Sequence, residues 1–279
     1  MGPLGWSVIL LATLYLAVCL LLFVKQRDLL YQPWTEPLDP ARLAELAPFE
    51  LIETLTADGL SLRHLWLPPA ETGAAVVVYF HGNGGNAAGR AAKMLQVLPA
   101  GQGLLLVEYR GYAGNPGAPS EAGLLVDAAS ALRWLEAQGI GPARWRLYGE
   151  SLGSGVATQV AASEAAAGSP VAGVALEAPF TSIAETAQQH YWYVPARWLV
   201  RDRFHSLARI GRLEAPLLIV HGRLDRVVPY EMSERLLDAA RPPKRLLGIE
   251  QGQHVDLLDF PEAAASMTRF LADPGGLGE

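Results

Sequence analysis

Cysteine is almost absent from this chain of 279 residues, whose only cysteine is Cys19. A single cysteine excludes an internal disulfide, which is compatible with a reducing compartment and with many proteins outside one. Basic residues are fewer than acidic ones: the chain has 22 Lys and Arg and 28 Asp and Glu, which gives a formal net charge of −6. Nucleic-acid binding needs a clustered basic surface, so we expect no nucleic-acid partner.

Signatures of metal and nucleotide binding are missing as well. No pair of Cys, His or carboxylate residues has the spacing of metal ligands. Gly84 and Gly85 lie in a glycine-rich loop, but the Lys-Ser/Thr ending of a phosphate-binding loop does not follow them. The sequence therefore predicts neither a metal ion nor a cofactor.

Charged side chains are absent from Met1 to Val24. This apolar stretch is long enough to cross a bilayer, which takes about 20 residues. A cleaved signal peptide would have a basic start and a small-residue cleavage site, and neither is present. Residues 1–28 are therefore predicted to be a transmembrane anchor that contacts membrane lipid, and residues 1–24 are expected to contribute nothing to the catalytic residues. The alternative is a core helix of a soluble protein.

Two basic residues, Lys25 and Arg27, follow this stretch. The positive-inside rule therefore favours a cytoplasmic location for the rest of the chain, although Asp28 reduces the charge difference. Residues 29–48 contain four prolines and are predicted to be an extended tether between membrane and domain.

Residues 49–272 have the pattern of one α/β domain, in which Asp58-Gly59 is the turn of a hairpin. Beyond it, short apolar runs alternate with helical patterns, which is typical of a mostly parallel sheet with helices on both faces. The sequence thus predicts an eight-stranded sheet followed by a flexible tail, 273–279. The expected strands are 49–56, 60–67, 75–80, 104–108, 144–148, 171–177, 217–220 and 244–249, and the expected helices are 87–98, 121–138, 152–167, 230–240 and 261–271.

The pentapeptide from Gly149 to Gly153 follows one of these strands and precedes a helix. In that context a G-x-S-x-G sequence predicts a nucleophile elbow. The turn is so tight that a Cβ at either glycine would collide with the neighbouring strand or helix. Ser151 is therefore the candidate nucleophile, and the N–H of Leu152, at the start of the helix, is a candidate oxyanion donor.

A serine nucleophile needs a general base, which is usually a histidine oriented by a carboxylate. In the elbow context the chain order is nucleophile, acid, histidine, and of six histidines only His254 follows every plausible acid. Two acids are possible, because Asp225 and Glu177 both follow or end strands at the edge where parallel sheets bind ligands. Asp225 is preferred for its short side chain and its Gly- and Pro-containing loop, and Glu177 stays open.

The second oxyanion donor is expected in the loop after the strand 75–80, which reads His81-Gly82-Asn83-Gly84-Gly85-Asn86. Glycines allow the backbone to turn its N–H groups toward a ligand, and the N–H of Asn83 is our candidate. His81 precedes the nucleophile, so we expect it to hold this loop by hydrogen bonds rather than to act as a base.

These motifs resemble those of the α/β-hydrolases over residues 49–271, and within them the membrane-anchored serine hydrolases that share a His-Gly-Asn-Gly/Ala-Gly-Asn loop. The resemblance implies an N-terminal anchor and hydrolysis of esters or thioesters; some relatives remove palmitate from proteins. Glu108 departs from the pattern, since relatives usually carry Asp there. The matching segments are 81–86, 109–112, 149–153, 177–180 and 221–225.

The segment after the sixth expected strand, about 181–210, contains an aromatic cluster beside Arg197, Arg201 and Arg203. In the α/β-hydrolase fold an insertion here commonly makes a cap over the pocket. The cluster would then contact an acyl chain or lipid; the alternative is a small satellite core beneath a loop.

The sequence therefore predicts a membrane-anchored serine hydrolase that acts on carboxylic esters or thioesters, with a small-molecule or acyl-chain substrate. One alternative is a peptidase or amidase, which would use the same triad. An alternative from another class is a non-catalytic membrane scaffold. Halide or epoxide chemistry is disfavoured, because relatives with those activities carry Asp at the elbow.

Overall fold

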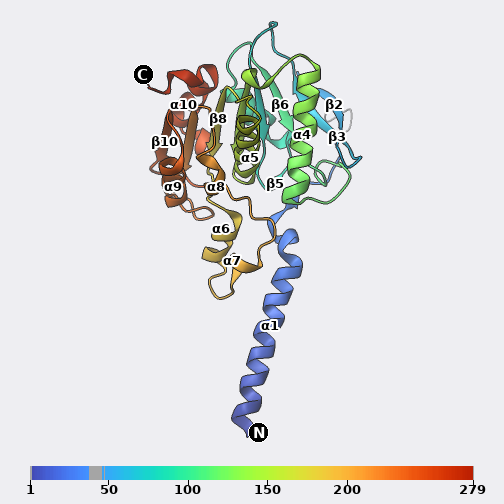
Figure 1. The fold of residues 1–279 in the computed structure, drawn as a ribbon, viewed down its shortest axis with the longest axis vertical. Helices are drawn as coiled ribbons and strands as arrows, with labels where there is room; N and C mark the ends of the chain where they lie inside the picture. The colour runs from blue at the N-terminus through green and yellow to red at the C-terminus, as the bar shows by residue number, and fades with distance from the viewer. Residues whose placement is uncertain (1, 38–45, 47, 279) are drawn as a thin grey trace.

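The computed structural model describes residues 2–37, 46 and 48–278. Its core is an eight-stranded sheet in the order β10-β9-β8-β7-β4-β6-β3-β2, with helices packed against it (Figure 1). β2 (Glu50–Leu55) pairs antiparallel with β3 (Ser61–Leu67), and β3 pairs antiparallel with β6, whereas the remaining neighbours are parallel. The predicted α/β-hydrolase fold is confirmed.

The other strands and the helices that cover them follow the expected order. The strands are β4 (Val76–Phe80), β6 (Gly103–Val107), β7 (Trp145–Glu150), β8 (Gly173–Glu177), β9 (Leu217–Gly222) and β10 (Lys244–Ile249). The helices are α3 (Ala91–Val97), α4 (Glu121–Ala137), α5 (Leu152–Ala166), α9 (Glu231–Ala239) and α10 (Pro261–Ala272).

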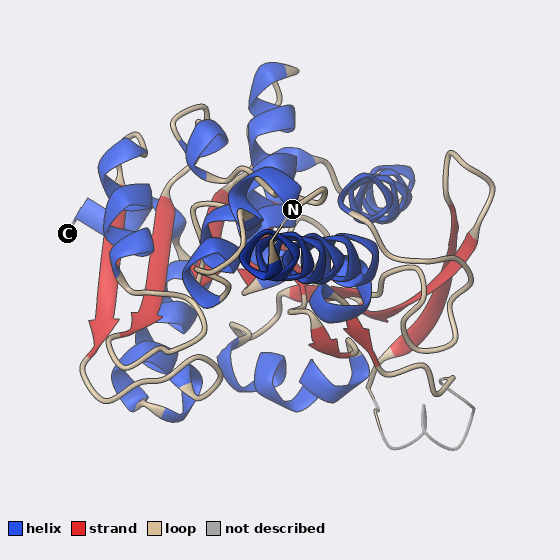
Figure 2. Ribbon diagram, turned by 90° about the horizontal axis from the view of Figure 1, so that it is seen from below, coloured by secondary structure: helices blue, strands red, loops and turns tan. Residues whose placement is uncertain are grey.

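The sheet is buried on both faces, and β4 shows why its sequence is apolar throughout. Val76, Val78 and Phe80 belong to one hydrophobic cluster, and Val77 and Tyr79 belong to the other. Successive side chains of a strand point to opposite faces, so a central strand between two helical layers needs an apolar residue at every position. Figure 2 shows helices lying on both sides of the strands.

The segment after β8 forms α6 (Ile183–His190), α7 (Ala196–Leu199) and α8 (Leu207–Ile210). α6 begins at Ser182, whose hydroxyl accepts a hydrogen bond from the N–H of Glu185 and caps the helix. α6 and α7 lie at the end of the domain from which α1 leaves, as Figure 1 shows. We refer to residues 181–210 as the cap.

α1 (Pro3–Leu30) is one continuous helix, and none of its residues is fully buried. It is long and apolar enough to cross a membrane, with a mean hydropathy of 2.8 over its most apolar window. The N-terminal part stands clear of the domain, while the C-terminal end reaches it (Figure 1).

The residues directly after α1, which belong to the predicted extended tether, are docked on the domain. Tyr31 is only 3% exposed, and β1 (Gln32–Pro33) pairs in parallel with β5 (Gly84–Gly85). The N–H groups of Gln32 and Trp34 donate to this partner loop, so Pro33, which has no N–H, is tolerated between them. Of the predicted tether, residues 38–45 and 47 lie outside the described residues.

The C-terminal residues also differ from the prediction. Pro274–Gly278 forms a 3-10 helix, η4, instead of a flexible tail. Asp273 accepts a hydrogen bond from the N–H of Gly275, and Pro274 packs so closely on Gly173 that a Cβ there would approach it to 2.7 Å. Local hydrogen bonding and this contact hold the segment against β8.

Candidate active site

The turn from β7 to α5 has the geometry of a nucleophile elbow. Ser151 has φ 49° and ψ −115°, a conformation that non-glycine residues rarely adopt. Its N–H donates to the carbonyl of Glu177 at 2.9 Å, which holds the strained residue in place. A Cβ at Gly149 would lie 2.5 Å from the carbonyl oxygen of Gly153, and one at Gly153 would overlap the carbonyl of Phe80. The predicted steric role of both glycines is confirmed.

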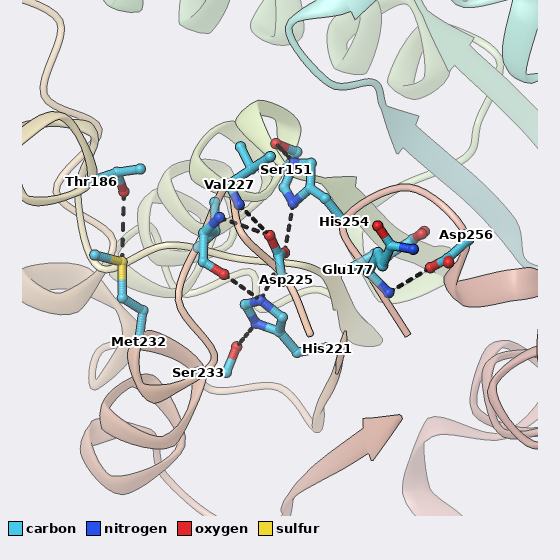
Figure 3. A network of polar contacts seen from close by, with 12 residues as sticks. Ser151, Glu177, Thr186, His221, Asp225, Val227, Met232, Ser233, His254 and Asp256 are labelled. Carbon is cyan, nitrogen blue, oxygen red and sulfur yellow. Dashed lines mark hydrogen bonds and ion pairs between the residues drawn. The ribbon is translucent and has the colours of Figure 1, made fainter. Parts of the chain in front are cut away.

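Three predicted site residues meet at this turn, although they come from distant parts of the chain. Ser151 Oγ lies 2.9 Å from His254 Nε2, and His254 Nδ1 lies 2.7 Å from Asp225 Oδ2. Figure 3 shows the side chains in this order, with Asp225 between His254 and a second histidine, His221. Both separations are hydrogen-bond distances, so a proton can pass from Ser151 to His254 without rearrangement.

The carboxylate of Asp225 is fixed through both of its oxygens. Oδ1 accepts hydrogen bonds from the N–H groups of Val227 and Val228, and Oδ2 faces His254 and the Nε2 of His221 at 3.0 Å. Burial alone would raise the pKa of Asp225, but the hydrogen bonds from His221, His254 and the backbone outweigh it and lower the pKa. The side chain is therefore an ionised, immobile acceptor for His254.

His221 also belongs to this arrangement, although no role was predicted for it from the sequence. It is fully buried, and its Nδ1 meets the hydroxyl of Ser233 at 2.5 Å. Its Nε2 lies near both the Asp225 carboxylate and the carbonyl of Val228. A signal was present in the sequence, because His221 lies at the end of β9, only four residues before Asp225 in the loop that follows.

The side chain of Glu177, the alternative acid, faces other partners. It accepts a hydrogen bond from the hydroxyl of Tyr148 and an ion pair from Lys93 at 2.8 Å. Burial raises the pKa of Glu177 above its ordinary value. The structure places Asp225 rather than Glu177 against His254.

Lys93 joins Glu177 to Glu150, the residue before Ser151. Its ammonium lies 2.6 Å from Glu150, which also meets Arg90 and the hydroxyl of Tyr79. Burial opposes ionisation of Glu150, but Lys93 and Arg90 outweigh it and lower the pKa of Glu150 to about 2. Two buried carboxylates thus share the Lys93 ammonium beneath the elbow, and Glu150 has Arg90 as a second cation.

Replacing Lys93 by Met is expected to destabilise the protein by about 3–5 kcal/mol, because it leaves buried charge without its partner. Urea unfolding of the detergent-solubilised protein at pH 7, followed by tryptophan fluorescence, measures this. Arg241→Met, which breaks the exposed pair with Glu214, is the control and should cost no more than about 1 kcal/mol. The loss in Lys93→Met should shrink on acidification, since Glu177 already has a raised pKa and becomes neutral first. Equal losses in both variants would contradict this account of the cluster.

The loop that carries Asn83 is held at both ends by Glu108. Glu108 Oε1 lies 2.9 Å from His81 Nε2, and Oε2 accepts a hydrogen bond from the N–H of Ala87 at 2.8 Å. His81 also contacts the carbonyl of Gly82, so it holds the loop by hydrogen bonds. Glu108 is the position at which the chain departs from its resemblance, and its buried side chain serves this loop directly.

Asn83, Ser151 and Leu152 all line one cavity of about 250 Å³. Within the part of the chain that the structure describes, the N–H groups of Asn83 and Leu152 donate to no other group, which leaves them available to an oxyanion. The remaining walls are mostly apolar and come from α1, α6, the end of α7 and the loop after β9. No role at the site was predicted for α1 from the sequence, yet Leu22 and Phe23 are among the lining residues.

Comparison with known proteins agrees with this architecture. A family model described as the α/β hydrolase fold matches residues 75–205. The uncharacterized protein Rv2307c of Mycobacterium tuberculosis is 37% identical over 266 residues, which cover 94% of this chain and 92% of that protein. The lysophosphatidylserine lipase ABHD12 of Danio rerio is 33% identical over 211 residues, covering 70% of this chain and 54% of the lipase.

Solved structures add a likeness in fold. The esterase Pf2001 of Pyrococcus furiosus superposes with a TM-score of 0.66 at 17% identity, covering 87% of this chain and 97% of the esterase. The esterase Est2 of Thermogutta terrifontis, with propionate bound, has a TM-score of 0.64 at 20% identity and covers 84% and 97%. At these sequence identities the similarity shows a shared fold and nothing about function.

Proposed function

This chain belongs to the α/β-hydrolase family, and on that premise we propose that it is a serine hydrolase that cleaves carboxylic esters or thioesters. The observation that carries the proposal is the hydrogen-bonded series Ser151, His254, Asp225 at the wall of an apolar cavity. A scaffold would have no need of a strained serine held within hydrogen-bond distance of an oriented histidine.

The proposed reaction proceeds in two halves. Ser151 Oγ attacks the carbonyl carbon while His254 Nε2 takes the hydroxyl proton, and Asp225 holds the other ring nitrogen as the donor. The N–H groups of Asn83 and Leu152 stabilise the negative oxygen of the tetrahedral intermediate. Collapse breaks the bond to the leaving alcohol or thiol, which takes the proton from His254. Water then repeats the sequence on the acyl-enzyme and releases the acid.

The apolar lining of the cavity supports an acyl chain as the part of the substrate that is bound. The similarity to a lipase named for a single-chain phospholipid points in the same direction. We propose that the substrate is an ester of one long acyl chain. A peptide substrate would use the same triad, and rate comparison separates the two.

Hydrolysis of p-nitrophenyl esters of increasing chain length, compared with aminoacyl p-nitroanilides, tests the proposed reaction. We expect measurable kcat/KM on the esters, rising with chain length until the cavity is filled, and at least ~10²-fold lower values on the anilides, whose leaving group is poorer. Preference for the anilides would identify a peptidase or amidase instead. Activity on neither, with folded protein, would favour the scaffold.

We also propose that α1 is a single-pass membrane anchor and that Lys25 and Arg27 keep the hydrolase domain on the cytoplasmic side. The apolar surface of the helix supports this, because Leu10, Leu14 and Leu21 are each at least 60% exposed. A core helix of a soluble protein would bury such side chains.

Fractionation after an alkaline carbonate wash tests the anchor. The full-length protein is expected in the membrane pellet, because a spanning helix is not released by breaking electrostatic contacts. A variant with Leu10, Leu14 and Leu21 all replaced by Asp is the control and should not be retained as an integral membrane protein. Recovery of the unaltered protein in the supernatant would contradict the anchor.

A further inference from the structure

The C-terminal end of α1 is tied to the cap by side-chain contacts. Arg27 makes a two-pronged ion pair with Asp202, at 2.8 Å from Nε and 3.0 Å from Nη2. Gln26 accepts a hydrogen bond from the N–H of Arg201 at 2.7 Å and donates to the carbonyl of Leu199. Bidentate pairs of this kind fix orientation as well as distance, so the last turns of α1 keep one position relative to the cap.

The same end of the helix also supports the oxyanion loop. The side-chain amide of Asn83 donates to the carbonyl of Leu30 at 2.9 Å, and the carbonyl of Asn83 accepts from the N–H of Gln32 at 3.1 Å. The hydroxyl of Tyr112 donates to that carbonyl as well, at 2.8 Å. Residues at the end of the apolar helix and directly after it therefore hold both the side chain and the carbonyl of Asn83, the residue whose N–H is the proposed oxyanion donor.

The cavity extends from the nucleophile to the apolar part of α1. Leu22 and Phe23 line it, and the first charged side chain of the helix, Lys25, follows two residues later. From Leu22 to Leu30 the helix rises about 12 Å. If the uncharged stretch fills the bilayer, the cavity thus begins at the membrane boundary and ends at Ser151.

The cap carries exposed aromatic side chains on the side of the domain from which α1 leaves. Trp192 is 78% exposed and Trp198 is 81% exposed, and Trp198 lies in α7, beside α1 in Figure 1. Arg201 lies over the ring of Phe23 at 5.8 Å. Tryptophan and arginine together are typical of the membrane–water interface, which places the rim of the cavity at that level.

From these contacts we infer that the last turns of α1 and the cap together form the acyl-chain subsite, and that the chain of a membrane lipid ester passes from the bilayer directly into it. Leu22 determines how long a chain the subsite accepts. The inference rests on the proposed ester hydrolysis. It makes the helix a part of the active site in addition to an anchor.

The test compares two substitutions at neighbouring positions of α1. Leu22→Trp fills the cavity, whereas Leu21→Trp adds the same side chain at a position that does not line it. The readout is the ratio of kcat/KM on p-nitrophenyl laurate to that on p-nitrophenyl butyrate, in detergent micelles. We expect Leu22→Trp to lower this ratio at least ~10-fold and Leu21→Trp to leave it within about twofold. Equal ratios in the two variants would overturn the inference and leave the proposed hydrolysis standing.

A second substitution at the same position distinguishes a change in chain-length preference from a loss of activity caused by misfolding. Leu22→Ala enlarges the cavity, so the preference for p-nitrophenyl palmitate over the laurate is expected to rise about threefold or more above that of the unaltered protein. Damage to the fold would lower both rates without changing the preference in this direction. An unchanged or reduced preference in Leu22→Ala would contradict the role of Leu22. If the unaltered protein hydrolysed none of these esters, the proposed function would fail first.

Discussion

Replacing Ser151 by Ala is expected to lower kcat on p-nitrophenyl esters by ~10³-fold or more. The substitution removes the hydroxyl oxygen that lies 2.9 Å from His254 Nε2, so no acyl-enzyme can form. A small residual rate is expected from the oxyanion donors and substrate binding alone. Steady-state kinetics of the purified protein, with circular dichroism to confirm the fold, measures the loss.

Ser154→Ala is the matched control, three residues further along on α5. Its hydroxyl is buried and has no hydrogen-bond partner within the described residues, so its removal should leave kcat within about twofold. A variant of Ser151 that kept the turnover of the unaltered protein would exclude the proposed mechanism. Equal losses in both variants would indicate damage to the helix rather than loss of a nucleophile.

Exchange of Asp225 for Asn is expected to lower kcat by up to ~10⁴-fold. An amide at this position presents an N–H to His254 Nδ1 or leaves it with a neutral acceptor, and the ring no longer keeps the tautomer that accepts the serine proton. The Val227 and Val228 N–H groups can still bind the remaining amide oxygen, which favours retention of the turn. The pH dependence of kcat/KM should change together with the rate.

Glu177→Gln separates the two acids that the sequence left open. Its side chain meets Tyr148 and Lys93 and not His254, so we expect kcat to fall by less than ~10-fold, with a lower unfolding midpoint from the altered charge cluster. A greater loss of kcat in Glu177→Gln than in Asp225→Asn would assign the acid to β8 instead of the loop after β9.

Much of the fold was predictable because the chain repeats one physical pattern. Short apolar runs such as 75–80 can be buried on both faces only in a central strand, and the helices between them enforce parallel pairing. The pairing of Gln32–Pro33 with Gly84–Gly85 was not predictable, since two-residue strands have no hydropathy period. The prolines of 29–48 indicate extended backbone but not where it docks.

The residues of the site likewise fall into those that could be predicted from the sequence and those that could not. Ser151 was a candidate from the glycines around the elbow, which are a local feature, and His254 was a candidate because it alone among the histidines follows both possible acids. Lys93 and Glu108 act through contacts with residues distant in the chain, so no local pattern distinguishes them from ordinary charged positions. His221 contacts Asp225, only four residues further along, and its position beside that acid was the available signal. Leu22 was hidden for another reason: an apolar run predicts a membrane span, and it does not reveal which of its side chains face a cavity.

Reaction with a fluorophosphonate probe, followed by mass spectrometry of the labelled peptide, tests the central claim most directly. Such probes form a covalent bond with a serine hydroxyl that an adjacent base has activated. We expect one label per chain, on Ser151, and no label on Ser151→Ala. Folded full-length protein that takes up no label, or that is labelled at another serine, would contradict the account of this chain as a serine hydrolase.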